Sequence, residues 1–306
     1  MKELIQMSRF GTAMILAVGD FERDEFAAAW AALQRLGPVA IAADLGTAIA
    51  SVCRTATPGR LDGPAPAEGE GEPAAIILAQ SYPGQFAAAA IERLQALAPL
   101  ARIVVVAGSW CEGEMRSGRP WPGAIRLYAC QAEPRLRREL AALLAGEPTP
   151  WTLPPTATEE ERLLAAAERD VPPRQGQVAI FGRRAALTGW LAAACRQRGY
   201  TATIAAPDDV AVVTAPHAAI LDCDDLDAMA VAEARELAIR LAPAPLIVLA
   251  GFPRADQVRA ALAAGAAAVL AKPIAFDDLD GQLAAVGQKG KAVNEPQRRG
   301  SSRQHT

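Results

Sequence analysis

The stretch RADQVRAALAAGAAAVLAKPIAFDDL, residues 254–279, gives the strongest indication of the fold. Apolar residues in its first part recur at three- and four-residue spacing, which predicts an amphipathic helix over about 254–264. Gly265 follows, a residue typical of helix C-termini. The short apolar run AVLA (268–271) then ends at a Lys-Pro dipeptide and is typical of a strand buried on both faces. A helix that leads directly into such a strand indicates a parallel sheet.

The same alternation of apolar strands and amphipathic helices extends across residues 176–288. Strands are predicted at 178–181, 202–205, 218–222, 246–250 and 268–271, and helices at about 186–199, 228–241, 254–264 and 276–286. Because nearly every residue of these strands is apolar, helices must cover both faces of the sheet. Right-handed crossovers then produce an open, doubly wound α/β domain, in which ligands meet the carboxyl ends of the strands.

The first half of the chain, residues 10–146, repeats this plan. Strands are predicted at 14–18, 39–42, 74–79, 103–107 and 125–129, and helices at about 26–36, 86–97 and 133–144. Residues 55–73, between the second and third strands, are rich in Pro, Gly and Glu and are predicted to form a disordered insertion. We therefore predict an α/β protein with two doubly wound parallel sheets.

Two polar segments flank the second of these domains. The Pro-rich stretch 147–175 is predicted to be the linker between the domains, with one short helix over 159–170. Residues 289–306 lack an apolar face and are predicted to be a disordered tail. A length of 306 residues fits two domains of ordinary size.

Composition argues against several classes of function. The net charge is −3 and no basic stripe is interleaved with aromatic residues, which argues against nucleic-acid binding. No apolar run approaches the roughly 18 residues that a membrane span requires. The five cysteines form no CxxC pair and are typical of reduced thiols, and with only two histidines, histidine-based catalysis is poorly supplied. We expect a cytoplasmic protein that is not an enzyme and binds neither nucleic acid nor membrane.

The stretch 254–273 resembles the receiver (CheY-like) domains of two-component response regulators. In that family a helix that ends in a Gly-Ala pair leads to a strand and a Lys-Pro dipeptide, here Lys272-Pro273. Residues 183–205, RRAALTGWLAAACRQRGYTATIA, are similar to the family's first helix and second strand. The first half is similar in the order and spacing of its strands, so the resemblance implies two tandem, divergent receiver-like copies.

The resemblance implies specific roles for residues of the second half. Asp222, at the end of the strand 218–222, takes the phosphoacceptor position, where a carboxylate can attack a phosphoryl group to give an acyl phosphate. Lys272 would contact the phosphoryl group, and Pro273 would follow a cis peptide bond. A purely structural ion pair between Lys272 and Asp222 is the alternative.

The second half departs from the family at two positions. The family holds Mg²⁺ with two acidic residues after the first strand, whereas this sequence has Arg183 and Arg184. Ala250 replaces the Ser or Thr that bonds the phosphoryl oxygen. We therefore expect Arg183 or Arg184 to fill the space of the metal and to hold Asp222. We expect no cofactor, with Mg²⁺ required only if Asp222 is phosphorylated.

The first half departs from the family further. Gln80 takes the phosphoacceptor position, and an amide cannot form an acyl phosphate. The fourth strand ends at Ala107-Gly108, without the hydroxyl residue. Asp20 and Glu22 follow the first strand, where an acidic pair would begin. We predict a receiver-like domain without phosphorylation chemistry.

The loop GSWCEGEMRSGRPWPG, residues 108–123, stands where the family has its fourth helix. It is a candidate binding loop, and its residues of interest are Trp110, Cys111, Glu112, Glu114, Arg116, Arg119 and Trp121. The glutamates can pair with the arginines, and the Trp rings offer stacking surfaces for an arginine. The cysteine has no histidine partner, so a catalytic role is disfavoured. Either the Trp side chains plug the pocket, or the loop is exposed for recognition.

Three functions remain open from the sequence. The first is a signal-transduction adaptor, a pseudo-receiver protein that acts through protein contacts; its candidate partners are a histidine kinase or another signalling protein, and a homodimer is left open. The second is a response regulator phosphorylated on Asp222 in a phosphorelay. The third is a nucleotide-binding α/β enzyme, although GRRAALTG (182–189) does not match GxGxxG and GxxxxGK[ST] is absent.

Overall fold

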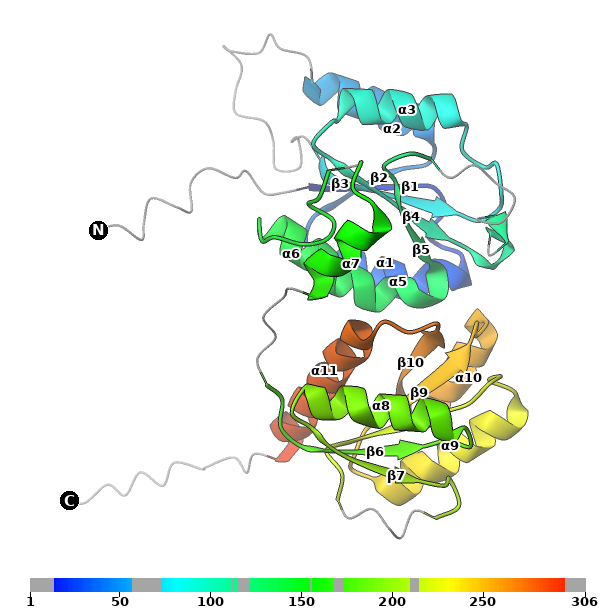
Figure 1. The fold of residues 1–306 in the computed structure, drawn as a ribbon. Coiled ribbons are helices and arrows are strands. Elements are labelled where there is room, and N and C mark those ends of the chain that lie inside the picture. The colour runs from blue at the N-terminus through cyan, green and yellow to red at the C-terminus, as the bar shows by residue number, and fades with distance from the viewer. Residues whose placement is uncertain are drawn as a thin grey trace, which may run out of the picture. The chain divides into compact units, whose positions relative to one another are not determined.

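The computed structural model describes residues 14–56, 73–111, 113–114, 121–154, 156–167, 173–209 and 215–294. The chain divides into two compact units, Met1–Asp170 and Val171–Thr306 (Figure 1). Most of the predicted insertion at 55–73 lies outside the described residues, as does the predicted tail from residue 295 onward.

The first domain contains a five-stranded, all-parallel sheet in the order β2-β1-β3-β4-β5. Its strands are β1 (Met14–Val18), β2 (Val39–Ala42), β3 (Pro73–Gln80), β4 (Arg102–Ala107) and β5 (Ile125–Tyr128). The central strands β1 and β3 are almost entirely buried, as their unbroken apolar runs predict. This strand order defines the flavodoxin-like, doubly wound fold and confirms the predicted fold class.

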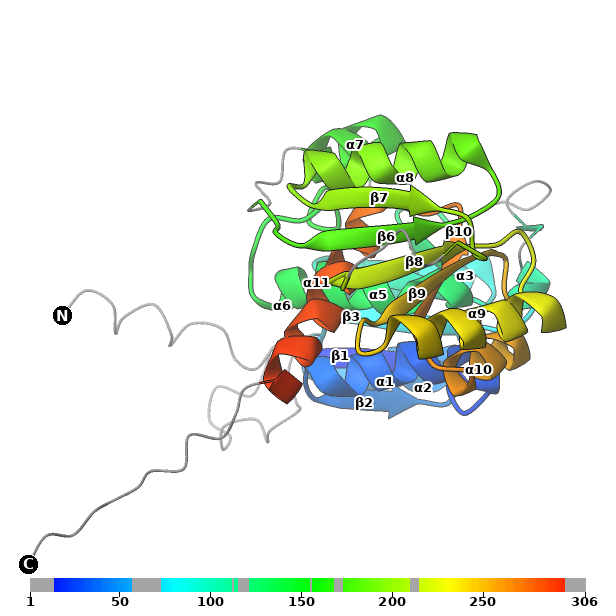
Figure 2. The same cartoon turned by 90° about the horizontal axis from the view of Figure 1, so that it is seen from below.

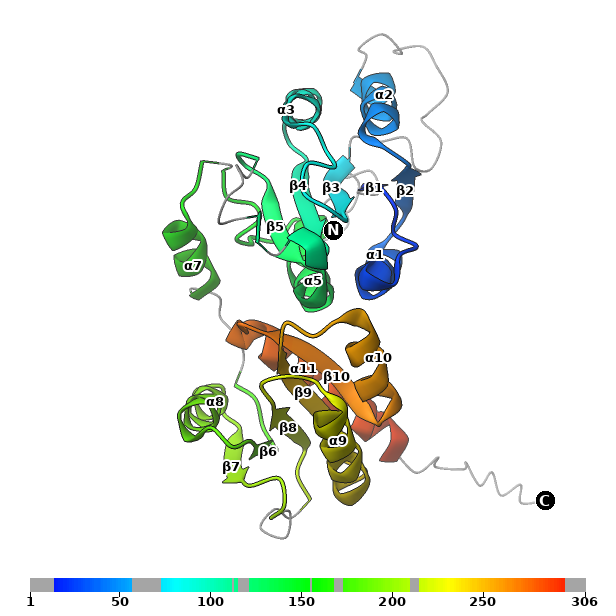
Figure 3. The same ribbon diagram turned by 90° about the vertical axis from the view of Figure 1, so that its right-hand side faces the viewer.

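Helices cover both faces of the first sheet (Figure 3). Helices α1 (Ala27–Leu36) and α5 (Ala129–Arg135) pack on one face, with α5 continued by a π-helical turn, η3 (Leu136–Leu140), and by α6 (Ala141–Leu144). Helices α2 (Leu45–Ala56) and α3 (Ala88–Leu97) pack on the other face. Helix α2 is absent from the prediction. It is set by a local cap, because the Thr47 backbone amide donates to Asp44 Oδ1 at 2.7 Å.

The first domain continues past residue 146, where the linker was predicted to begin. Trp151 is buried in the core on the α1 and α5 face. Arg102, at the start of β4, fixes this segment by donating to the carbonyls of Trp151 (2.5 Å) and Thr152 (3.0 Å). Helix α7 (Glu159–Ala167) belongs to the same unit. Much of 147–175 is therefore packed structure and not a free connection.

The second domain repeats the architecture with the order β10-β9-β8-β6-β7 (Figure 2). Its parallel strands are β6 (Gln177–Phe181), β7 (Thr201–Ala205), β8 (Ala218–Asp222), β9 (Leu246–Gly251) and β10 (Ala266–Lys272). Helices α8 (Ala185–Gln197) and α11 (Phe276–Asn294) cover one face, and α9 (Ala228–Leu241) and α10 (Ala255–Ala263) cover the other. Helix α11 runs to Asn294, so the predicted disordered tail begins too early at 289.

Burial follows the two-layer plan in both domains. The side chains of the central strands alternate between two apolar clusters, one under each helical layer. This arrangement leaves polar chemistry to the loops that follow the strands. Within the described residues, every helix is too short or too polar to cross a bilayer.

Candidate functional site

Asp222 and Lys272 meet at the carboxyl edge of the second sheet. They are the last residues of β8 and β10, and parallel strands bring their carboxyl ends to one edge. Lys272 Nζ donates to Asp222 Oδ1 at 2.8 Å and to the Cys223 carbonyl at 2.6 Å. The Asp222 side chain is only 2% exposed and that of Lys272 17%. The pair is therefore a largely buried ion pair, and the Lys272-Pro273 peptide bond beside it is cis, as the resemblance implies.

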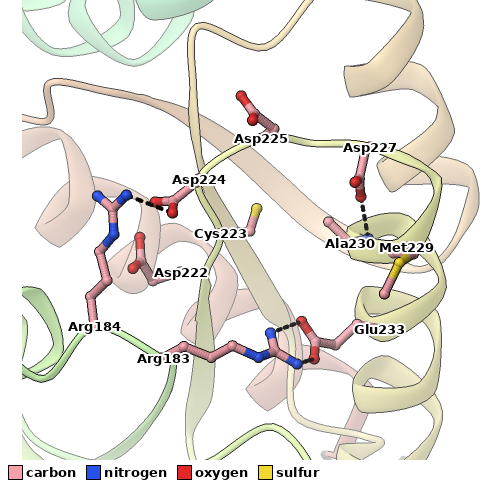
Figure 4. Close-up of a pocket in the computed structure, with 10 residues that line it drawn as sticks. All are labelled: Arg183, Arg184, Asp222, Cys223, Asp224, Asp225, Asp227, Met229, Ala230 and Glu233. Carbon is pink, nitrogen blue, oxygen red and sulfur yellow. Dashed lines mark hydrogen bonds and ion pairs between the residues drawn. The ribbon is translucent and has the colours of Figure 1, made fainter.

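Arg183 and Arg184 follow β6. They bind carboxylates other than Asp222, the partner expected from the sequence. Arg183 forms a bidentate pair with Glu233 on α9, with Nη2–Oε1 at 2.6 Å and Nη1–Oε2 at 3.0 Å. Arg184 Nη2 lies 2.6 Å from Asp224 Oδ2. Figure 4 shows both arginines bound to these other carboxylates. The expectation that one of them holds Asp222 is therefore wrong, because the ion-pair partner of Asp222 is Lys272.

A pocket of about 370 Å³ opens between these groups (Figure 4). Its lining is charged, with two arginines facing five carboxylates across the edge of the sheet: Arg183, Arg184, Asp222, Cys223, Asp224, Asp225, Asp227, Met229, Ala230 and Glu233. Asp227 is occupied as the cap of α9, since its carboxylate accepts from the Ala230 amide at 2.8 Å. Three of the five carboxylates are in ion pairs, Asp222 with Lys272, Asp224 with Arg184 and Glu233 with Arg183.

The backbone around Asp222 is closely packed. An added Cβ at Gly182 would lie 2.8 Å from Thr188 Cγ2 and 3.1 Å from Asp222 Cβ, so only glycine fits here without displacement. Ala250, fully buried at the end of β9, supplies no hydroxyl to this edge. Burial, more than any neighbouring charge, raises the pKa of the adjacent Cys223 thiol to about 11.

A magnesium ion is the group that the receiver resemblance implies at this edge. The residues after β6 are cations, and Asp222 and Asp224 are each engaged by a cationic side chain. Within the part of the chain that the structure describes, no three His, Cys, Asp or Glu side chains are grouped to hold a metal. This donor set does not fit Mg²⁺.

At the corresponding edge of the first domain, Gln80 is fully buried at the end of β3. Its Nε2 donates to both carboxylate oxygens of Glu114, at 3.3 and 3.2 Å, and to the Tyr82 carbonyl at 3.3 Å. Glu114 also forms an ion pair with Arg126 of β5. A carboxylate from the 108–123 loop is therefore held directly over the position that the resemblance assigns to a phosphoacceptor.

The 108–123 loop is thus fixed by contacts that its own sequence does not suggest. Glu114 forms an ion pair with Arg126 of β5, which lies outside the loop. Cys111 is buried, and its thiol donates to the Gln80 carbonyl at 3.6 Å. Burial, with a smaller effect of Glu114, raises the Cys111 pKa to about 11. The predicted residues Glu112, Arg116 and Arg119 lie outside the described residues.

The two Trp residues of this loop differ in their surroundings. Trp121 is partly buried and packs on Phe86, with ring centroids 6.3 Å apart. Trp110 is 78% exposed. Glu114, Cys111 and Trp121 therefore face inward, whereas Trp110 is exposed to solvent.

Glu25 also lies at the carboxyl edge of the first sheet, although the sequence analysis did not predict a role for it there. Its Oε2 accepts from the Ser109 amide at 3.0 Å and from the Ser109 hydroxyl at 3.2 Å. Buried side-chain atoms without a hydrogen-bond partner, within the described residues, are Glu25 Oε1, Gln80 Oε1 and Arg126 Nε. Glu25 Oε1 still lies 3.4 Å from Arg23 Nε. Residues 84 positions apart meet here, so no local signal could have joined Glu25 to Ser109.

Comparisons with solved structures find response regulators and their receiver domains, at low similarity. NtrX from Brucella abortus, in complex with ADP, is 16% identical with a TM-score of 0.36, over 39% of this chain and 28% of that chain. A CheY-like response regulator from Mesorhizobium loti is 24% identical with a TM-score of 0.30, over 37% of this chain and 98% of that chain. The signal receiver domain of a modulated diguanylate cyclase from Desulfovibrio desulfuricans is 23% identical with a TM-score of 0.33, over 40% and 100%. No family model and no curated protein matches the chain.

Proposed function

We propose that this chain is a signalling adaptor whose two receiver-like domains act through protein contacts and without aspartate phosphorylation. The observation that carries the proposal is the burial and ion pairing of the Asp222 carboxylate. This carboxylate is buried and bonded to Lys272, and the arginines at the metal position are tied to Glu233 and Asp224. Phosphorylation would have to break the Lys272 bridge at a site whose residues do not fit the divalent cation that neutralises the transferred charge.

The first domain supports the same proposal by a different route. Gln80 cannot carry an acyl phosphate, and the space over it is taken by Glu114 and its ion pair with Arg126. The Glu114 carboxylate holds the 108–123 loop over Gln80. The domain therefore needs no phosphoryl group to keep this loop in one conformation. The proposal assigns no catalytic role to either domain.

Phosphoryl labelling tests this proposal. The full chain is incubated with acetyl phosphate or phosphoramidate and Mg²⁺, next to a phosphorylatable receiver domain as positive control, and intact mass is measured. We expect the control to gain a phosphoryl group and this chain to remain unmodified. A stable gain of one phosphoryl group that disappears in Asp222→Asn would overturn the proposal.

That opposite result would support the second candidate, a response regulator that uses Asp222. The observation in its favour is the pocket of about 370 Å³ that opens beside Asp222 (Figure 4). The rim arginines Arg183 and Arg184 are 73% and 64% exposed, so solvent already reaches their ion pairs. Labelling in the presence of EDTA distinguishes a metal-dependent reaction from one that these arginines assist.

A further inference from the structure

Trp110 is presented to solvent on a backbone that is held on both sides. It is the middle residue of a short 3-10 turn, η2 (Ser109–Cys111). On one side Ser109 donates twice to Glu25, and on the other Cys111 is buried with its amide donating to the Gly108 carbonyl at 2.9 Å. A large aromatic ring on a pre-ordered turn loses little conformational entropy on binding, which is typical of binding hot spots.

An acidic turn lies against this Trp-bearing loop. Residues 20–25, DFERDE, contain four acids and one arginine. An added Cβ at Gly108 would lie 2.7 Å from the Glu25 carboxylate oxygens, so the turn and the loop are in direct contact. Asp20 and Glu22 of this turn are exposed. Among the described residues, this turn therefore places negative charge beside the loop that carries Trp110.

Tyr82 provides a second exposed aromatic ring at the same edge. It lies two residues after the end of β3 and is 55% exposed. Its carbonyl accepts from Gln80 Nε2, and Cys111, the neighbour of Trp110, bonds the Gln80 carbonyl. Tyr82 and Cys111, the neighbour of Trp110, are thus both hydrogen-bonded to Gln80 from the two loops that follow β3 and β4.

We propose that Tyr82, Trp110 and the acidic turn 20–25 form a docking surface for an arginine-bearing segment of a partner protein. Guanidinium groups stack on aromatic rings and pair with carboxylates, so one side chain can use both features of this surface. Lysine lacks the planar group, and an acidic peptide or a nucleic acid would be repelled by the turn. The inference rests on the proposed adaptor function and names the chemistry of its partner.

Fluorescence anisotropy with a defined probe tests the surface. The probe is a fluorescein-labelled peptide, GRRGSRRG, used with the full chain at low ionic strength, and peptides with Lys or Glu in place of every Arg serve as references. We expect the Arg peptide to bind several-fold more tightly than the Lys peptide, and the Glu peptide not to bind. Trp110→Ala should weaken binding about tenfold, equivalent to about 1.4 kcal/mol.

Further variants test the contribution of the acidic turn and the specificity of the Trp110 effect. Asp20→Asn with Glu22→Gln should weaken binding about threefold or more and reduce its salt dependence. The matched control is Leu100→Ala, because Leu100 is also 78% exposed on the same domain but lies on the loop between α3 and β4. It should leave binding unchanged, and circular dichroism of each variant verifies folding.

The outcomes separate this surface from the proposed function. No binding of the Arg peptide at millimolar protein, or equal binding by wild type and Trp110→Ala, would overturn the docking surface and leave the phosphorylation-independent adaptor standing. Equal affinity for the Arg and Lys peptides would overturn the specificity for guanidinium. Phosphorylation of Asp222 would overturn the adaptor function while leaving a positive peptide result intact.

Discussion

Lys272 Nζ donates to Asp222 Oδ1 at 2.8 Å, and this bond joins the carboxyl ends of β10 and β8. The resemblance to receiver domains implies phosphoryl chemistry for both residues, and in the structure they form a largely buried ion pair. A carboxylate this well buried is stable as an anion only with a partner, so the pair resists separation.

Breaking the pair from the lysine side should be costly. Lys272→Met leaves the buried Asp222 carboxylate uncompensated, and we expect the free energy of unfolding to fall by about 3–5 kcal/mol. Urea denaturation of the full chain measures this loss, with Asp222→Asn/Lys272→Met recovering much of it. Arg240→Met is the control, because its i,i+4 pair with Glu236 is exposed and contributes under about 1 kcal/mol. Equal effects of the two substitutions would contradict the finding.

The rim arginines should matter little for stability. Arg183 and Arg184 are mostly exposed, so substituting each with Ala should cost less than about 1 kcal/mol. Thermal unfolding checks this expectation. A loss comparable to that of Lys272→Met would mean that an arginine supports Asp222 after all.

Two glycines near the amino end of α8 offer a direct test of packing around Asp222. Gly182→Ala places a methyl group 2.8 Å from Thr188 Cγ2, and we expect destabilisation of about 1–3 kcal/mol. Gly189→Ala lies within α8 with nothing inside 4 Å and should stabilise by about 0.5–1 kcal/mol. Both are measured by chemical denaturation, and opposite signs are the expected result.

The Glu114 anchor should govern the order of the 108–123 loop. Glu114→Ala removes the ion-pair partner of Arg126, whose side chain is 13% exposed, so we expect a loss of about 2–4 kcal/mol. Acrylamide quenching of Trp fluorescence should also increase, because Trp121 packs less closely. Glu92→Ala, at an exposed position of α3, is the control and should change neither quantity.

Alkaline pH should destabilise the protein through its buried thiols. Burial raises the pKa of Cys111 and Cys223 to about 11, above the value of about 8.5 expected in the unfolded chain. The unfolded state therefore releases protons first, so this contribution is complete below about pH 8.5 and is lost as pH rises toward 11. Urea midpoints between pH 8 and 11 should fall, and Cys111→Ala/Cys223→Ala should flatten that fall relative to its own value at pH 8. An unchanged slope would refute the assignment.

Local sequence determined most of the fold. Each strand of both sheets was predicted from an apolar run, because burial on two faces leaves a continuous hydrophobic pattern. Helix α2 escaped prediction, since it begins at the side-chain cap of Asp44 and carries mostly small and β-branched residues. The packing of Trp151 also escaped, because its partner Arg102 lies 49 residues away.

The candidate sites were likewise predictable in part. The sequence by itself placed Asp222, Lys272 and Gln80 at the carboxyl ends of strands, since parallel topology brings those ends together. Which side chains pair depended on the tertiary structure: Arg183 forms an ion pair with Glu233 and Glu114 with Arg126, and the neutral Ser109 donates to Glu25. The tertiary structure also decided that Trp110 faces solvent while Trp121 packs inward. Ion pairs and exposure depend on distances between segments far apart in the chain, and hydrophobic periodicity carries no information about them.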